Sequence, residues 1–153
     1  MEIKQKTEIR ELDSLYKKVD NAYHDLATRI GFSNSGFLVL YSIVELGGGC
    51  VQTDISKKYS ISPQTLSSSI RNLEKDGYIY LEQGYGRNKK LFLTPLGKRF
   101  AEKIIYPLMN AENEIFNILT SDETACLLRL TNKYVEILTN QISNLSLPKK
   151  EDI

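Results

Sequence analysis

Hydroxyl, amide and guanidinium side chains are concentrated in one short segment, "ISPQTLSSSIRNLEKDGYI", at residues 61–79. Three consecutive serines, residues 67–69, interrupt what otherwise has the pattern of a short, well-capped helix. Serine is a poor helix former because its hydroxyl competes for the hydrogen-bonding groups of the backbone. The serines therefore indicate a requirement other than helix stability, and their hydroxyls could donate and accept hydrogen bonds with a ligand.

The segment is predicted to fold as a helix with Ser62 as N-cap and Pro63 as its first residue, ending before Gly77. Its apolar residues recur at spacings of four and three and form one narrow stripe, made by Leu66, Ile70 and Leu73. The stripe would pack against the rest of the protein, and we expect Ser69, which lies near it, to point inward. The other two serines then lie on an outward-facing surface.

The neighbouring segments predict a winged helix-turn-helix. A short helix from about Thr53 to Lys58 precedes the serine helix through the tight connection "YSIS". Two β-type runs, residues 78–82 and 89–94, follow it and are separated by the glycine-bearing loop "QGYGRN". A hairpin placed directly after a helix-turn-helix forms a wing.

The rest of the chain is predicted to be helical. Apolar residues at helical spacing indicate a long helix over residues 8–30 and a buried helix over residues 37–46. Thr94 and Pro95 open a further helix through about Leu119, which Pro107 should kink or break. The last helix begins with a capping box made by Thr120 and Glu123 and continues towards Leu145.

The predicted fold class is mainly α with a small β-hairpin wing. We expect a single domain over residues 1–153, in which residues 34–94 form a winged helix-turn-helix lobe. Helices within residues 1–33 and 95–145 have more apolar surface than a chain of this size can bury, which predicts a two-fold homodimer. Residues 146–153 are expected to be a frayed tail.

The charge of the chain is unevenly distributed, although the formal net charge is only +1. Residues 57–103 contain ten Lys/Arg against four Asp/Glu, a local charge of +6. A local basic excess is typical of a surface that contacts polyanions. Because base edges in the major groove present donors, acceptors and the thymine methyl group, the outward face of the serine helix is a candidate for reading DNA, through Gln64, Thr65, Ser67, Ser68 and Arg71.

The predicted wing has three basic residues. Arg87 lies at the tip of the loop, where an arginine could enter a narrow minor groove. Lys89 and Lys90 begin the return strand, and we expect them to bind phosphates, which adds affinity without sequence information.

These segments resemble the MarR family of transcriptional regulators, which are dimeric winged-helix proteins of bacteria and archaea. The resemblance lies in "SPQTLSSSIRNLEKDGYI", which is similar to the recognition helix and first wing strand of that family, in "RNKKLFLTPLG", and in "LTSDETACLLRL". It implies that base-reading residues are Ser62, Pro63, Gln64, Thr65, Ser67, Ser68 and Arg71, and that Arg87 contacts the minor groove. The family usually has an aspartate two residues before this arginine, where the present chain has Tyr85.

The resemblance further implies binding of double-stranded DNA at a pseudo-palindromic operator, commonly as a repressor. Many such regulators release DNA when a small, often aromatic, acid enters a cleft between the dimerisation helices and the DNA-reading lobe. Four tyrosines could line such a cleft, although tyrosines at helical spacing are more often ordinary core and interface residues: Tyr16, Tyr23, Tyr41 and Tyr106.

Other classes of function have weaker support. Thiol-based redox sensing would need a reactive cysteine; Cys126 is expected to be packed, whereas Cys50, beside a triple glycine, could be exposed near a helix N-terminus. Metal sensing has only His24 as an imidazole ligand, so we expect no metal and no cofactor. A winged helix used as a protein-protein interaction module remains an alternative, but such a wing does not need basic residues.

An enzyme is not indicated, because the chain lacks a nucleophile-base pair, a phosphate-binding glycine loop and paired carboxylates on a recognisable scaffold. Its apolar runs are too short and interrupted to span a bilayer, and its first ten residues lack the apolar core of a secretory signal. A cytoplasmic location without a membrane partner is the resulting expectation.

Overall fold

The structure is a computed structural model that describes residues 3–86 and 88–148. The chain divides into two compact units, Met1–Pro107 and Leu108–Ile153. The first unit contains the helix-turn-helix and the wing, and the second contains most of the last two helices. The prediction that the chain functions as a single domain with two dimerisation segments stays a prediction.

The first unit begins with two helices joined by a short turn. Helix α1 spans Thr7–Arg29 and α2 spans Asn34–Glu45. The side chain of Ser33 accepts a hydrogen bond from the Gly36 N–H at 3.1 Å and so caps α2 at its N-terminus. Helix α2 is the central element of the core, in agreement with its continuous apolar sequence: Val39 and Leu40 have no exposed surface.

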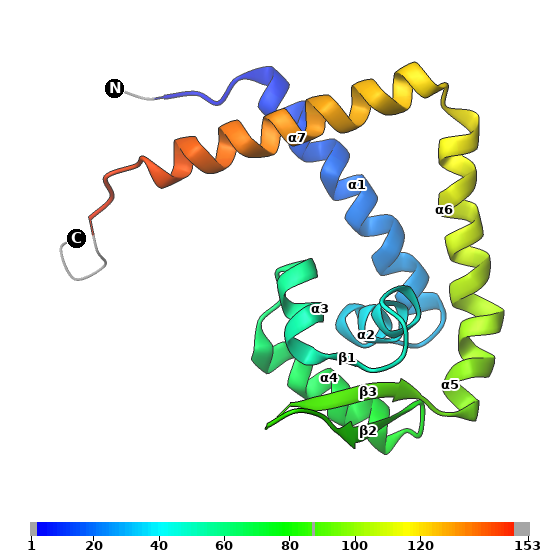
Figure 1. The fold of residues 1–153 in the computed structure, drawn as a ribbon. Coiled ribbons are helices and arrows are strands. Elements are labelled where there is room, and N and C mark those ends of the chain that lie inside the picture. Colours follow the sequence, from blue (N-terminus) through cyan, green and yellow to red (C-terminus); the bar gives the residue numbers. More distant parts are fainter. Residues whose placement is uncertain (1–2, 87, 149–153) are drawn as a thin grey trace. The chain divides into compact units, whose positions relative to one another are not determined.

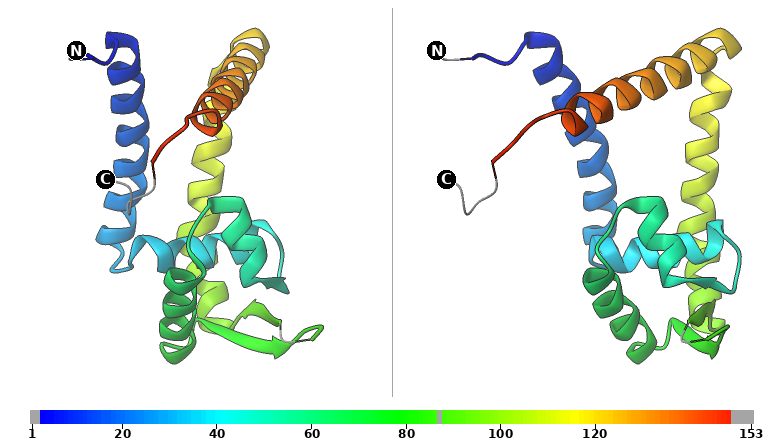
Figure 2. Two further views of the ribbon diagram at one scale, coloured as in Figure 1. Left: turned by 90° about the vertical axis from the view of Figure 1, so that its left-hand side faces the viewer. Right: turned by 60° about the vertical axis from the view of Figure 1, so that its left-hand side comes forward.

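The next elements form the predicted winged helix-turn-helix (Figure 1). Strand β1 (Cys50–Val51) leads into α3 (Gln52–Tyr59), and α4 (Pro63–Lys75) follows after a short turn. Strands β2 (Ile79–Gln83) and β3 (Lys89–Leu93) form the hairpin, which Figure 2 shows from two further sides. The bounds of these elements agree closely with the sequence prediction, except that β1 was not predicted.

Within the described residues the three strands make one antiparallel sheet in the order β1-β3-β2. Ile79 is paired with Leu93 and Gln83 with Lys89, which fixes the register of the hairpin. Cys50 pairs with Leu91 and so connects the segment before α3 to the wing. Tyr80 and Phe92 lie directly opposite each other and stack with ring centroids 5.4 Å apart, which stiffens the base of the wing.

The core of the first unit is formed where these elements meet. Its fully buried large side chains come from α2, α3, α4, the sheet and the helical segment after it: Leu40, Ile43, Ile55, Leu66, Ile79, Leu91 and Ile105. The apolar stripe predicted for α4 is buried, since Leu66, Ile70 and Leu73 are each at most 5% exposed. This packing determines which face of α4 is left for a ligand.

The helical segment after the wing does not break at Pro107 but contains a π-helical segment just before it. Helix α5 (Pro95–Phe100) passes into a π-helical segment, η1 (Ala101–Ile105), which is followed by α6 (Tyr106–Ile118). The Tyr106 N–H donates to the Ala101 carbonyl, five residues back. Pro107 has no N–H and its ring crowds the carbonyl four residues before it, so a wider turn just before the proline is the expected accommodation.

The second unit contains α7 (Ser121–Ser143). The predicted capping box is present: the Thr120 hydroxyl accepts a hydrogen bond from the Glu123 N–H at 3.2 Å, and the Glu123 carboxylate accepts one from the Thr120 N–H at 2.8 Å. These hydrogen bonds to the carboxylate lower the pKa of Glu123 below its ordinary value, because they favour the charged form. None of the described helices is long and apolar enough to cross a bilayer.

Candidate nucleic-acid interface

Helix α4 starts as the sequence predicts. The Ser62 hydroxyl accepts a hydrogen bond from the Thr65 N–H at 3.2 Å, and the two hydroxyls of these residues lie 2.8 Å apart. Pro63 occupies the first helical position. An N-cap of this kind stabilises a helix by about 1 kcal/mol, so Ser62 has a structural role whether or not it also contacts DNA.

One face of α4 is exposed along its whole length. The side chains on it recur at spacings of three and four and are all polar or charged: Gln64, Ser68, Arg71, Asn72 and Lys75. Of these, Asn72 and Lys75 were not among the predicted reading residues. Arg71 is oriented along the helix by a hydrogen bond from Nε to the Ser67 carbonyl at 3.3 Å. A guanidinium has five N–H donors, so the rest of this group can still bind a ligand.

The three serines of α4 point in three directions. Ser69 is only 7% exposed and its hydroxyl donates to the Ser35 hydroxyl at 2.7 Å, which confirms that it packs inward. Ser68 is exposed, as predicted. Ser67 is half-buried and accepts a hydrogen bond from the Gln52 side chain at 2.8 Å, so it lies at the edge of the exposed face.

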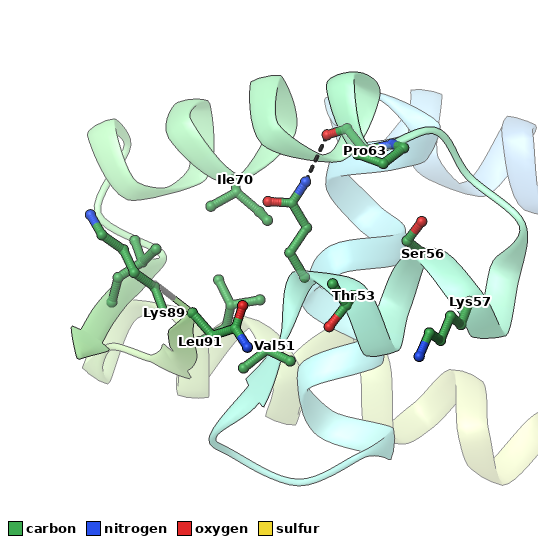
Figure 3. A pocket seen from close by; sticks show the side chains of 11 residues that line it. Val51, Thr53, Ser56, Lys57, Pro63, Ile70, Lys89 and Leu91 are labelled. Atoms are coloured by element: carbon green, nitrogen blue, oxygen red, sulfur yellow. Dashed lines mark hydrogen bonds between the residues drawn. The ribbon is translucent and has the colours of Figure 1, made fainter. Parts of the chain in front are cut away.

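Gln52, the first residue of α3, contacts the candidate recognition helix but was not among the residues predicted from the sequence. Its amide nitrogen lies 2.7 Å from the Pro63 carbonyl oxygen in addition to its contact with Ser67. The contact to Pro63 is the dashed line in Figure 3. A single side chain therefore ties the start of α3 to the first turn of α4.

A cavity of about 390 Å³ lies between α3, α4 and the wing (Figure 3). Its walls combine apolar side chains, such as Ile70 and Leu91, with polar and basic ones, including Thr53, Lys57 and Lys89. Of the predicted DNA-binding residues, Pro63 and Lys89 line this cavity, whereas Gln64, Ser68 and Arg71 are not among its lining residues.

The tip of the wing is shaped by hydrogen bonds within the loop. The Gln83 amide donates to the Gly86 carbonyl at 2.7 Å, and the Gly84 N–H donates to the Asn88 carbonyl at 2.8 Å. Tyr85, at the position where the resembled family usually has aspartate, is 97% exposed. Arg87, the predicted minor-groove residue, lies outside the described residues.

The two wing lysines have different neighbours. Both are exposed, as a role in phosphate binding requires. Lys90 lies directly opposite Glu82 across the hairpin, whereas Lys89 lies opposite the uncharged Gln83. The Glu82 carboxylate partly offsets the positive charge at position 90, so Lys89 is the stronger of the two candidates for a phosphate contact.

The two cysteines contradict the sequence expectations. Cys50 was a candidate exposed thiol, but its pairing with Leu91 leaves it only 8% exposed. Burial, with a smaller contribution from the Asp54 charge, raises the pKa of Cys50 to about 11, so it is a protonated and unreactive thiol at neutral pH. Cys126 was expected to be packed but is exposed in the single chain. Its sulfur lies 3.8 Å from Nη2 of Arg129.

The remaining candidate residues are His24, considered as a metal ligand, and the four tyrosines considered for an effector cleft. Nδ1 of His24 is hydrogen-bonded to Oδ1 of Asn34 at 3.0 Å, which connects α1 to the start of α2. Among the described residues no cluster of three potential metal ligands occurs. A second cavity, of about 620 Å³, lies near the end of α1 and α4, and neither cavity is lined by the four tyrosines considered for an effector cleft.

Comparisons with known proteins agree with this geometry. Residues 32–84 match the model of the MarR family. The HTH-type transcriptional regulator MntR of Geobacillus thermodenitrificans is 30% identical over 67 residues, which are 44% of this chain and 45% of the relative. The chain therefore aligns with less than half the length of this relative.

Two solved structures show the same fold. A MarR family regulator from Neisseria meningitidis has a TM-score of 0.77 at 22% identity, covering 90% of this chain and 98% of that one. MepR of S. aureus, solved in complex with DNA, has a TM-score of 0.66 at 21% identity, covering 88% of this chain and 99% of that one. At these identities the likeness concerns the fold, which extends beyond the matched winged helix to the terminal helices.

Proposed function

We propose that the protein is a MarR-family, sequence-specific DNA-binding transcriptional regulator, a proposal that the match of residues 32–84 to the family model supports. In this proposal α4 is the recognition helix and lies in the major groove, while the hairpin contacts the flanking backbone and minor groove. The curated relatives it resembles are named as transcriptional regulators, and one protein of the same fold was solved with DNA.

The observation that supports this proposal best is the exposed polar face of α4. A helix needs only its buried stripe to fold, yet the opposite face holds amide, hydroxyl and guanidinium groups and no apolar side chain: Gln64, Ser68, Arg71, Asn72 and Lys75. Arginine and glutamine can bind guanine and adenine through paired hydrogen bonds in the major groove. We assign base reading to this face and phosphate binding to Lys89 and Lys90.

The protein is proposed to act as a two-fold homodimer on a pseudo-palindromic operator. The large apolar side chains that stay exposed in the single chain are concentrated on α1, α6 and α7, and include Leu15, Val19, Phe116, Leu128, Val135, Ile137 and Ile142. Soluble monomers rarely expose so many apolar residues, which mark an interface. A two-fold axis through these helices presents two copies of α4 to half-sites about one turn of DNA apart.

The regulator is further proposed to be a repressor that a small organic effector releases from DNA. This part rests on the family resemblance, since the tyrosines considered for an effector cleft, such as Tyr16 and Tyr23 on α1, do not line either described cavity. An aromatic acid could be held by stacking on such rings and by hydrogen bonds from their hydroxyls.

The test is selection of bound fragments from the host genome, followed by affinity measurements on the selected operator and on random DNA. Arg71→Ala and Gln64→Ala should weaken operator binding by about 1–3 kcal/mol each while leaving random-DNA binding nearly unchanged. Lys89→Ala is the matched comparison, since removing a phosphate contact should weaken both equally and reduce the salt slope by about 1.

The outcomes separate the possible functions. A wild-type protein that selects no sequence, or that stays bound to DNA unchanged as salt rises, is not a DNA-reading regulator. If Arg71→Ala and Gln64→Ala lowered affinity for every sequence equally, the assignment of base reading to α4 would be wrong even though DNA binding remained.

A further inference from the structure

We propose that Gln52 is a specificity-determining residue, because it fixes the Ser67 hydroxyl as a hydrogen-bond donor toward DNA. This inference rests on the proposed function and adds a residue of α3 to the reading surface. It concerns the direction in which the Ser67 hydroxyl donates its hydrogen bond, which can be detected as a preference for particular base pairs in the bound DNA.

The orientation of the Gln52 amide follows from its contact with Pro63. A backbone carbonyl oxygen only accepts hydrogen bonds, so the group 2.7 Å from it must be the amide nitrogen and not the amide oxygen. The same NH₂ group has a second hydrogen, and the Ser67 oxygen lies 2.8 Å from the nitrogen. Because a neutral amide nitrogen does not accept, Ser67 is the acceptor in this contact.

The Ser67 hydroxyl hydrogen then has no acceptor in either of two neighbouring groups, the Pro63 carbonyl and the Gln52 NH₂ group. A helical serine often donates its hydroxyl to the carbonyl four residues earlier, which here is that of Pro63. In helical geometry the Pro63 carbonyl accepts a hydrogen bond from the Ser67 N–H, and its remaining lone pair accepts the hydrogen bond from Gln52. With Gln52 donating to both atoms, the hydroxyl hydrogen of half-buried Ser67 is left for the exposed side of α4.

A hydroxyl held in this way discriminates between base edges. Guanine O6 and N7, adenine N7 and thymine O4 accept hydrogen bonds in the major groove, whereas the cytosine amino group only donates. Ser67 should therefore favour a base edge with an acceptor at the position it contacts. Without Gln52 the hydroxyl could turn to the Pro63 carbonyl and present its oxygen outward, so the preference would relax or reverse.

A double-mutant cycle tests the coupling between the two residues. The four proteins are wild type, Gln52→Met, Ser67→Ala and the double variant; methionine has a similar length to glutamine but no donor. The readout is the relative affinity for all four base pairs at each operator position, which does not change if a variant is only less stable. We expect Gln52→Met to reduce discrimination at one position roughly fivefold, as loss of one hydrogen bond implies, and to have no such effect when Ser67 is already alanine.

Gln64→Met is the matched control, because Gln64 lies on the exposed face of α4 and does not contact Ser67 in the contacts described above. It should alter discrimination at a different base pair and leave the Ser67 position unchanged. Should Gln52→Met change no preference, or change it equally with and without the Ser67 hydroxyl, the inference is wrong while the proposed function stands. A wild-type protein with no preferred sequence would overturn both.

A measurement on the DNA needs no Gln52 variant. Single acceptors of the selected operator are removed with 7-deazapurines for N7, 2-aminopurine for guanine O6 and 5-methyl-2-pyrimidinone for thymine O4. At one position the wild type should lose roughly fivefold in affinity and Ser67→Ala should lose nothing. If no acceptor deletion weakens the wild type more than Ser67→Ala, Ser67 is not a donor to DNA and the inference falls.

Discussion

Replacing Gly97 by alanine should destabilise the winged helix-turn-helix, because a Cβ atom there would lie 2.1 Å from the Tyr78 carbonyl oxygen. That carbonyl also accepts a hydrogen bond from the Thr94 N–H at 3.0 Å, and it lies 3.1 Å from the Thr94 hydroxyl, whose shorter contact is to the Gly77 carbonyl at 2.6 Å. Real Cβ contacts are essentially never shorter than 3.0 Å. The first turn of α5 would therefore have to move away from Tyr78 by about 1 Å.

The size of the effect can be worked out from these contacts. Losing the hydrogen bond from the Thr94 N–H to the Tyr78 carbonyl costs about 1 kcal/mol, and overpacking against the backbone adds roughly 3 kcal/mol. Alanine is the better helix former and returns about 1 kcal/mol. The free energy of unfolding should fall by about 3 kcal/mol in total.

Urea unfolding followed by far-UV circular dichroism, at one fixed protein concentration, measures this loss. Gly77→Ala is the matched control, because Gly77 has φ +78° but no atom lies within 4 Å of the position that a Cβ would take, so only left-handed strain of about 1–2 kcal/mol is expected. If Gly97→Ala were as stable as Gly77→Ala, the close approach of α5 to the Tyr78 carbonyl would be refuted.

Two further predictions concern titrating groups. Cys50 should react with iodoacetamide far more slowly than Cys126 at pH 8, since Cys50 is buried and its pKa is raised to about 11; peptide mass spectrometry would show the reverse order if Cys50 were a sensor thiol. Glu45 should stabilise the fold in an acid-dependent way. Burial acts to raise its pKa, but hydrogen bonds from Lys58 and Tyr59 and the Lys58 charge outweigh this and lower it below its ordinary 4.5. A lowered folded-state pKa gives stability that is present above pH 4.5 and is lost as the pH falls through the folded value. Glu45→Gln should therefore flatten the acid side of a plot of melting temperature against pH. An unchanged acid side would contradict a stabilising interaction between Glu45 and Lys58.

The sequence predicts most of the fold because local signals and apolar spacing agree along the chain. The caps at Ser62, Thr94 and Thr120 are each confirmed by a hydrogen bond from the following turn to the side chain. Pro107 is accommodated by a π-helical segment just before it, and the helix continues past the proline without a break. Such features depend on neighbours within a few residues, which the sequence displays directly.

Features that depend on distant partners were not predictable in the same way. Strand β1 is too short to show alternation, and Cys50 is buried where it pairs with Leu91, far along the chain. The role of Gln52 depends on a residue 15 positions later. Helical periodicity identified Ser67 as an outward residue but could not identify which side chain from another helix lies beside it.

The divergent directions of the three serines imply different tolerances to mutation. Ser69 is hydrogen-bonded to Ser35 in the interior, and Ser67 is hydrogen-bonded to Gln52 on α3, so a change at either position would remove a contact between helices. Ser68 alone meets solvent without a tie to another helix in the contacts described above. Among descendants of this protein, position 68 is thus where a new binding-site preference could arise first, by a single exchange that leaves folding untouched.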